Sequence, residues 1–461
     1  MRLAYHRRRF ADVAVSLRAA RAAATRDRWP RERLQRFQQE RLDALVRHAA
    51  RHSPLYRERL RDLPAGPVAL ADLPIMTKAE MMERFDDLVC DPTLRRDALL
   101  DWVEALDADR LHPTGNRVMT TSGSSGRKGL FVYDQAGWTA IAAQFLYFSA
   151  MAGTRPRVPR LKLAAIGGGS PAHMSRRGAS TLDVGLHRIL SLPVTLPLDE
   201  LVAALNAFDP DVLNVYPSMG VLLAEEQRAG RLWLSLETMS TSSELRTPEA
   251  AARIHAVFGV RPFDLYASTE GLWGGECERH QGPHLFEEDV IVENVDGDGR
   301  AVPDGAPGAR LLVTNLANRV QPLIRLEVSD AMTLSAPTCG CGRTLRRVER
   351  VEGRTEDVIW LPGADGRPVA VVPLQFSVVA RDRDVVEFQV VQERAGLVIL
   401  VVARGAAPGL EERIAASVRE RLQALGVPPV PIDVRRPDAL VRSAGGKLAL
   451  VVADRQALAT A

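Results

Sequence analysis

Apolar residues recur at helical spacing along the first sixty residues of the chain. The positions that share one face are Leu34, Phe37, Leu42, Leu45 and Val46. Polar and basic residues occupy the opposite face, as expected for a helix with about 3.6 residues per turn. The pattern predicts a basic helical segment over residues 1–62 that packs on the body of the protein.

Short apolar runs alternate with helical segments over residues 135–330. The runs are LKLAAI at 161–166, DVLNVYP at 211–217, LETMSTSSE at 236–244 and RPFDLYASTE at 261–270. Strands that alternate with helices are typical of a layered α/β body. The expected fold class is therefore α/β.

The pattern changes after about residue 354. Residues 387–404 predict two strands around a turn, and residues 410–426 predict an amphipathic helix that ends at a glycine. A small α+β unit is expected here. We therefore predict a large N-terminal domain of residues 1–353 and a small C-terminal domain of residues 354–461.

Composition and charge narrow the class of protein. Apolar residues make up 46% of the 461 residues and charged residues 25%, which is ordinary for a globular protein. No run reaches the roughly 20 apolar residues that span a bilayer, and no apolar segment follows the basic N-terminus. The net charge of +3 is too small to indicate nucleic acid. A cytoplasmic protein without nucleic-acid or membrane partners is expected.

Lysine is rare in a chain that is otherwise rich in arginine. The four lysines are Lys78, Lys128, Lys162 and Lys447. Lysine carries a compact charge on a flexible stem, whereas arginine carries a planar fork. Each lysine is therefore a candidate for a role that arginine does not fill, although drift alone explains some of them.

Residues 120–129, TTSGSSGRKG, contain five hydroxyl side chains and three glycines between two apolar runs. Glycines allow backbone N–H groups to approach phosphate oxygens, and hydroxyls donate further hydrogen bonds. The spacing differs from that of a Walker A loop. Composition alone is also consistent with a surface loop that binds no ligand.

Two weaker motifs follow. Residues 266–271, YASTEG, come directly after a predicted strand, where ligands of open α/β sheets gather. Residues 445–447, GGK, place a lysine on a glycine-rich turn near the C-terminus. Each motif alone is also consistent with an ordinary solvated loop.

Together and in this order, the motifs resemble the adenylate-forming superfamily of acyl- and aryl-coenzyme A ligases, adenylation domains and luciferases. The matching segments are 120–129, YASTE at 266–270, IRLEVSD at 324–330, GRTED at 353–357 and GGK at 445–447. Residues 53–88 and 339–354 carry a finer resemblance to the phenylacetate–coenzyme A ligase branch, and within it to relatives of the synthetase that adenylates a deazaflavin cofactor.

The resemblance implies an ATP site. The loop would cradle the β- and γ-phosphates through Thr121, Ser122, Gly123, Ser124, Ser125, Gly126 and Lys128. Near the adenine it implies Ser243, Glu244 and Tyr266, with Ala267 and Ser268 following. Asp330 would accept from the ribose hydroxyls, assisted by Arg354.

The resemblance also implies the catalytic groups. Thr269 would bind the α-phosphate, Glu270 would bind Mg²⁺, and Lys447 would bridge the substrate carboxylate and the α-phosphate. Glu356 matches the acidic residue of the hinge about which a mobile C-terminal domain rotates. Such a reaction joins two anions, so it depends on alignment and charge neutralisation.

A Cys/His set matches one found in the phenylacetate-ligase branch. Its members are Cys277, His284, Cys339 and Cys341, with His280 as the alternative nitrogen ligand. Three thiolates and one imidazole suit a structural, tetrahedral Zn²⁺. The alternative is free thiols beside a surface histidine.

The expected activity is ATP-dependent activation of a small carboxylic acid, with an aromatic acid favoured, followed by transfer to coenzyme A or an amine. His173, Tyr216 and Trp273 are candidate pocket residues. The segment after the hinge lacks the Arg-Gly of most ligases, and this departure concerns the second step, thioester formation. Alternatives are adenylation of a cofactor hydroxyl or of nitrite, and a non-catalytic nucleotide-binding module. The sequence leaves the oligomeric state open, with a homodimer among the alternatives.

Overall fold

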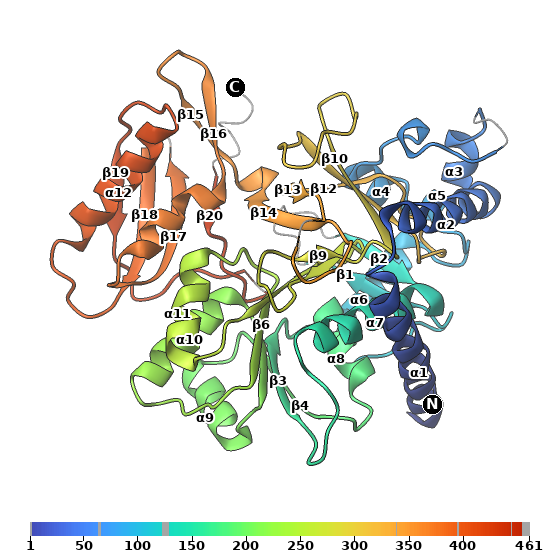
Figure 1. Ribbon diagram of the computed structural model, residues 1–461, viewed down its shortest axis with the longest axis horizontal. Coiled ribbons are helices and arrows are strands. Elements are labelled where there is room, and N and C mark those ends of the chain that lie inside the picture. The colour runs from blue at the N-terminus through green and yellow to red at the C-terminus, as the bar shows by residue number, and fades with distance from the viewer. Residues whose placement is uncertain are drawn as a thin grey trace. The chain divides into compact units, whose positions relative to one another are not determined.

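The computed structural model describes residues 2–62, 66–121, 129–337, 339–393, 396–443 and 445–453. Figure 1 labels its helices and strands. The chain divides into two compact units. The first comprises residues 1–193, 263–328 and 332–350, and the second residues 194–262, 329–331 and 351–461.

The first unit begins with helices and continues with strands. Its helices are α1 (Arg2–Arg26), α2 (Arg31–His52), α3 (Pro54–Arg59), η1 (Leu70–Asp72), α4 (Lys78–Glu83), α5 (Phe85–Leu88), α6 (Arg96–Glu104), α7 (Gln135–Met151) and α8 (Met174–Leu182). Its strands are β1 (Arg117–Thr120), β2 (Leu130–Tyr133), β3 (Lys162–Gly167), β4 (Arg188–Pro193), β7 (Phe263–Ala267), β8 (Trp273–Gly275), β9 (His284–Leu285), β10 (Val290–Val295), β11 (Arg310–Asn315) and β12 (Leu326–Val328). Strands β13 (Asp330–Ser335) and β14 (Arg347–Arg354) have residues in both units.

Strand pairing within the first unit is mixed. β3 and β4 are parallel, whereas β7, β8 and β9 form an antiparallel meander. β10, β11 and β12 form a separate three-stranded antiparallel sheet. β1 and β2 form a two-stranded antiparallel ribbon in which Thr120 lies opposite Leu130. The hydroxyl- and glycine-rich segment is therefore the connection between two paired strands.

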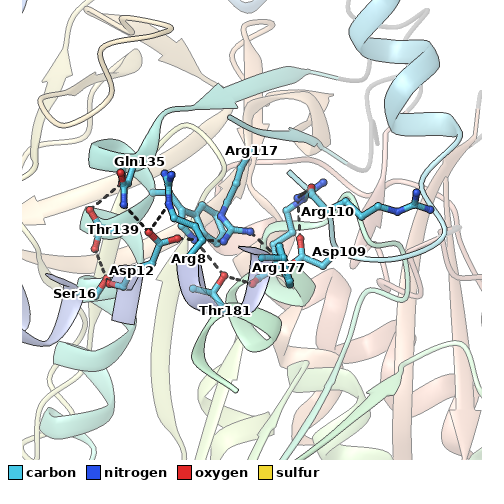
Figure 2. A network of polar contacts seen from close by, with 12 residues as sticks. Arg8, Asp12, Ser16, Asp109, Arg110, Arg117, Gln135, Thr139, Arg177 and Thr181 are labelled. Carbon is cyan, nitrogen blue, oxygen red and sulfur yellow. Dashed lines mark hydrogen bonds and ion pairs between the residues drawn. The ribbon is translucent and has the colours of Figure 1, made fainter. Parts of the chain in front are cut away.

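A buried polar network ties helix α1 to strand β1 (Figure 2). The guanidinium of Arg117 lies 3.5 Å from carboxylate oxygens of both Asp12 and Asp109. Arg177 pairs with the other oxygen of Asp109 at 2.8 Å, and Gln135 donates to Asp12 at 3.0 Å. Arg117 and Arg177 are almost fully buried. Loss of one partner would leave an uncompensated buried charge, so the network fixes the strand that leads into the loop.

The second unit contains α9 (Leu198–Phe208), β5 (Val212–Val215), α10 (Pro217–Arg228), β6 (Thr238–Ser242), α11 (Pro248–Phe258), η2 (Thr355–Asp357), β15 (Ile359–Pro362), β16 (Pro368–Val371), η3 (Pro373–Arg381), β17 (Val385–Glu393), β18 (Gly396–Ala403), α12 (Leu410–Ala424), β19 (Ile432–Arg435) and β20 (Val451–Val452). β5 and β6 are parallel. The four-stranded sheet has the order β19-β18-β17-β20.

Helix α12 illustrates how the sequence specifies this unit. Leu410, Ile414, Val418 and Leu422 are spaced four residues apart, and all four are buried. They form one apolar stripe that belongs to the same buried cluster as residues of β17 and β18. Figure 1 shows helix α12 beside the strands of this sheet. Gly426 follows the helix with φ +83°, a left-handed conformation that glycine adopts without steric cost.

The expected fold class is confirmed: the chain is a mixed α/β protein with a large N-terminal body and a small C-terminal α+β part. The four apolar runs within residues 135–330 coincide with strands β3, β5, β6 and β7, of which β3 extends one residue beyond its run. The antiparallel sheet of β10, β11 and β12 was not predicted. The domain boundary at residue 353 stays a prediction. No helix among the described residues is long and apolar enough to cross a membrane.

Candidate active site

The loop between β1 and β2 is closed at its base by two hydrogen bonds. The backbone N–H of Thr121 donates to the carbonyl oxygen of Gly129 at 3.0 Å. The backbone N–H of Gly129 donates to the Thr121 hydroxyl oxygen at 2.8 Å. The other predicted phosphate-binding residues, Ser122, Gly123, Ser124, Ser125, Gly126 and Lys128, lie outside the described residues.

The YASTE segment ends strand β7 and turns into β8. The backbone N–H of Ser268 donates to the carbonyl oxygen of Leu272 at 3.0 Å, and the Ser268 hydroxyl accepts from the backbone N–H of Leu272 at 3.2 Å. Gly271 has φ +101°, and a Cβ there would lie 2.1 Å from the Asn315 amide nitrogen. Only glycine suits both this conformation and this close approach.

Two side chains outside the motifs bind this turn through hydrogen bonds. The Tyr133 hydroxyl donates to the carbonyl oxygen of Thr269 at 2.7 Å. The Asn315 amide donates to the carbonyl oxygen of Glu270 and to the Tyr133 oxygen, each at 3.2 Å. Tyr133 is the last residue of β2 and lies opposite Arg117, so its hydrogen bond ties the acidic turn to the end of the β1–β2 ribbon that lies away from the loop. Sequence reasoning missed both residues.

The side chain of Lys78, the first residue of α4, contacts both the acidic turn and the base of the loop. Its Nζ lies 3.3 Å from a carboxylate oxygen of Glu270, whose side chain is only 10% exposed. A Cβ at Gly129 would lie 2.8 Å from the Lys78 Cε, so the lysine stem passes over the base of the loop. The rarity of lysine was the one sequence signal that pointed to this residue.

Lys447 lies on a tight turn in the second unit. The backbone N–H groups of Gly446 and Lys447 donate to the Ser443 carbonyl and hydroxyl oxygens at 2.7 and 3.1 Å. The backbone N–H of Ser443 donates back to the Lys447 carbonyl at 2.9 Å. Gly446 has φ +74°. The glycine pair therefore builds the turn, and the lysine extends from it half-buried.

The predicted ribose and hinge residues also lie in the second unit. The backbone N–H of Thr355 donates to the carbonyl oxygen of Ser329, the neighbour of Asp330, at 2.7 Å. The guanidinium of Arg354 lies 3.6 Å from a carboxylate oxygen of Glu356. Asp330 and Arg354 are thus brought close through adjacent backbone. Their predicted roles, and that of Glu356, stay predictions.

The predicted adenine residues fall in both units. Tyr266 and Ala267 lie on β7, opposite Gly274 and Trp273 of β8. Ser243 follows β6 with φ +72°, an uncommon conformation for serine. Glu244 comes next, and its carboxylate accepts two backbone hydrogen bonds in the second unit.

The three candidate pocket residues are positioned differently. Trp273 is fully buried: its ring packs edge-on against Phe145 at 4.5 Å, and its indole N–H donates to the Ser268 carbonyl. Tyr216 precedes α10 and is 3% exposed. His173 precedes α8, and its Nδ1 lies where a Cβ on Gly168 would approach to 2.5 Å. Their contact with substrate stays a prediction.

The four expected metal ligands converge in the first unit. The donor atoms of Cys277, His284, Cys339 and Cys341 all lie within 4.8 Å of one another, and all four residues are buried. Two sulfurs are 3.7 Å apart, and the Cys341 sulfur lies 3.5 Å from the His284 Nε2. Tetrahedral zinc with bonds of about 2.3 Å to sulfur and 2.0–2.1 Å to nitrogen has edges of about 3.8 and 3.5 Å. The donor set therefore fits zinc.

Electrostatics at this cluster suit metal ligation. Burial, together with Arg343, lowers the pKa of His284 to about 4, so its imidazole is neutral at neutral pH. Burial raises the pKa of Cys277 to about 12. A neighbouring cation would have to stabilise that thiolate. The alternative ligand, His280, lies instead beside Glu276 at 3.4 Å and against the Phe263 ring.

The sequence is similar to that of known ligases. It is 28% identical to a phenylacetate–coenzyme A ligase of Thermus thermophilus over 379 residues, which cover 80% of each chain. It is also 28% identical to the Escherichia coli phenylacetate–coenzyme A ligase, covering 73% of this chain and 75% of that protein. No protein-family model matches the chain.

Solved structures share the fold. A 2-hydroxyisobutyryl-CoA ligase in its postadenylation state superposes with a TM-score of 0.74 at 22% identity, covering 94% of this chain and 92% of that one. An amide bond synthetase from Marinactinospora thermotolerans gives a TM-score of 0.53 at 18% identity, covering 73% and 68%. The comparisons bear out the resemblance to the adenylate-forming superfamily: the chain shares the fold of these enzymes and is similar in sequence to phenylacetate–coenzyme A ligases. The finer resemblance to deazaflavin-related members stays a prediction.

Proposed function

We propose that this chain uses ATP and Mg²⁺ to activate a small carboxylic acid as an acyl adenylate. One carboxylate oxygen of the acid attacks the α-phosphorus, and the bond from that phosphorus to the oxygen bridging to the β-phosphate breaks. Pyrophosphate leaves and acyl-AMP forms. A thiol or amine then attacks the acyl carbon, and AMP leaves with the bonding electrons.

The contact that carries the proposal is the ion pair between Lys78 and Glu270, in which the lysine stem passes over Gly129 at the base of the loop. It joins a hydroxyl- and glycine-rich loop to a turn that presents a hydroxyl and a carboxylate. A triphosphate needs donors for its oxygens and an acidic ligand for its metal, and both are available at this junction. The likeness to ligases of known activity supports the same chemistry.

The proposed role of each residue follows from the charge that its side chain would bring to the phosphates or to the substrate carboxylate. Glu270 would bind Mg²⁺, whose contact with the phosphates neutralises the attacked group. Thr269 and the loop residues, including Lys128, would hold phosphate oxygens. Lys447 would bring a cation to the substrate carboxylate and the α-phosphate, where negative charge develops. Tyr266, Ser243, Asp330 and Arg354 would bind the nucleoside.

Coenzyme A is the proposed acceptor. The sequence relatives are named coenzyme A ligases, and the solved neighbours include both coenzyme A ligases and an amide bond synthetase. An amine is the second possibility. We also propose that residues 354–461 rotate about Glu356 between the two steps, and that Zn²⁺ occupies the Cys/His cluster as a structural ion.

A screen of acid-dependent pyrophosphate exchange tests the proposal. Aryl and short aliphatic acids are supplied with ATP, Mg²⁺ and labelled pyrophosphate, and nitrite is included as a separate substrate. Exchange with at least one carboxylic acid is expected. Exchange with nitrite alone, or nucleotide binding without exchange for any substrate, would contradict acid activation. Adding coenzyme A or amines to the active acid then identifies the acceptor.

A further inference from the structure

Glu244 bridges two backbone segments of the second unit through one carboxylate. One oxygen accepts from the backbone N–H of Ser218 at 3.1 Å, near the start of helix α10. The other accepts from the backbone N–H of Leu448 at 2.8 Å. Leu448 is the residue directly after Lys447, so the bridge ends beside the proposed catalytic lysine.

The backbone conformation before Glu244 directs its carboxylate toward the start of helix α10. Ser243 adopts φ +72° at the end of β6, which turns the chain so that Glu244 faces the start of α10. The first backbone N–H groups of a helix have no partner within the helix, and its N-terminus favours negative charge. Glu244 therefore meets a preformed site for a carboxylate, and its second oxygen stays available to Leu448.

The turn that carries Lys447 is also held by contacts that do not involve Glu244. Arg442 donates to the Ser218 hydroxyl at 2.8 Å and pairs with Glu387. A Cβ at Gly446 would lie 2.2 Å from a methyl carbon of Val194. Contacts on both sides therefore fix the turn, and Lys447 lies between Gly446 and the anchored Leu448.

We propose that Glu244 is a positioning residue that docks the Lys447 turn for adenylation. This role rests on the proposed function, and it differs from a direct contact with adenine. A lysine on a glycine-rich turn loses conformational freedom when it enters a site. The hydrogen bond to Leu448 orders the turn in advance, so Glu244 raises the rate of the step in which Lys447 takes part.

The test compares Glu244→Ala and Glu244→Gln with wild type. Glu244→Ala removes both acceptors, whereas Glu244→Gln keeps one oxygen and the same shape. Pyrophosphate exchange is expected to lose about tenfold or more in kcat for the alanine variant, and less for the glutamine variant. The KM for ATP should change by less than about threefold, because the docking contact acts through the lysine.

Hydrogen exchange provides a readout that needs no substrate. The Leu448 amide should exchange about tenfold faster in Glu244→Ala than in wild type, since its acceptor is gone. Exposed Glu237, just before β6, provides the control: Glu237→Ala should change neither the exchange of Leu448 nor kcat. If the alanine variant does not fold, Glu244→Gln carries both measurements, with smaller changes expected in the same directions.

The outcomes separate this proposal from its alternatives. A raised KM for ATP with kcat and Leu448 protection unchanged would assign Glu244 to adenine binding and overturn the docking role. Unchanged Leu448 protection in every variant would overturn it as well. If wild type shows no exchange with any acid, the proposed function fails, whereas the amide measurement still tests the Glu244 contact.

Discussion

The Tyr133 hydroxyl donates to the carbonyl oxygen of Thr269 across 2.7 Å, and this contact joins residues 136 positions apart in the chain. Burial and the nearby Glu270 carboxylate raise the pKa of Tyr133 above its usual range. The phenol therefore keeps its proton and acts as a donor throughout the working pH range.

Tyr133→Phe should weaken catalysis more than it weakens the fold. Loss of the donor leaves the Thr269 carbonyl without this partner, which costs about 1 kcal/mol of stability. The turn is then held less firmly against strand β2, and kcat for pyrophosphate exchange should fall about tenfold. Tyr56→Phe is the control, because the buried Tyr56 hydroxyl likewise bonds to the backbone, accepting from the N–H of Ile324 at 3.1 Å. Equal losses of activity in the two variants would contradict the positioning role.

Lys447→Ala should abolish most of the adenylation rate. The side chain is half-buried on a turn, so its removal should leave the melting temperature within about 2 °C of wild type. Removal of one preorganised charge contact typically costs about 10²–10³ in rate. The measurement is acid-dependent pyrophosphate exchange. Lys162→Ala, at the first residue of β3, is the control because ligands gather at the opposite ends of parallel strands. Equal exchange by Lys447→Ala and wild type would remove Lys447 from this step.

Lys78→Met should lower the affinity for the ATP–magnesium complex. The variant keeps the stem over Gly129 but removes the charge 3.3 Å from Glu270. We expect kcat/KM for ATP to fall about tenfold and the magnesium dependence of the rate to change, because Glu270 loses its partner cation. Titration of initial rates with Mg²⁺ at fixed ATP checks this. An unchanged magnesium profile would show that the Lys78–Glu270 pair is only structural.

Cys339→Ser should lower both metal content and stability. Wild-type protein is expected to carry about one zinc per chain by elemental analysis, whereas the variant should carry much less. The zinc-dependent part of the melting temperature should be lost in the variant and in wild type treated with a chelator. Cys90→Ser, remote from the cluster in sequence, controls for thiol loss. Wild type without bound metal, and insensitive to chelator, would contradict the zinc assignment.

Glu288 should make stability depend on pH. Burial and the neighbouring Asp289 raise the pKa of Glu288 to about 7. Its folded-state pKa lies above the unfolded value, so the protonated form favours folding; that contribution is present below about pH 4.5 and is lost as pH rises through 7. Glu288→Gln should therefore raise the melting temperature at pH 8 relative to wild type and bring little gain at pH 5. Equal gains at both values would contradict this.

The sequence alone determined the elements with strong periodicity. The apolar spacing of α12 and the strands β3, β5, β6 and β7 were predicted because each depends on residues close together in the chain. The sheet of β10, β11 and β12 was missed, although VIVENV at 290–295 and RLLVTN at 310–315 are rich in the aliphatic and β-branched residues that favour strands. Pairing across residues 296–309 and 316–325 decides that sheet, and the sequence does not show which segments pair.

The order of glycine, hydroxyl, acidic and lysine motifs was enough to predict the class of enzyme, because each motif is local. Only the tertiary structure revealed the partners that hold those motifs in place: Tyr133 and Asn315 at the turn, Lys78 beside Glu270, and Glu244 at the lysine turn. Hydrogen bonds and ion pairs act over about 3 Å in space and are indifferent to separation along the chain. The sequence therefore shows which chemical groups are present, and only the tertiary structure determines which of them come into contact.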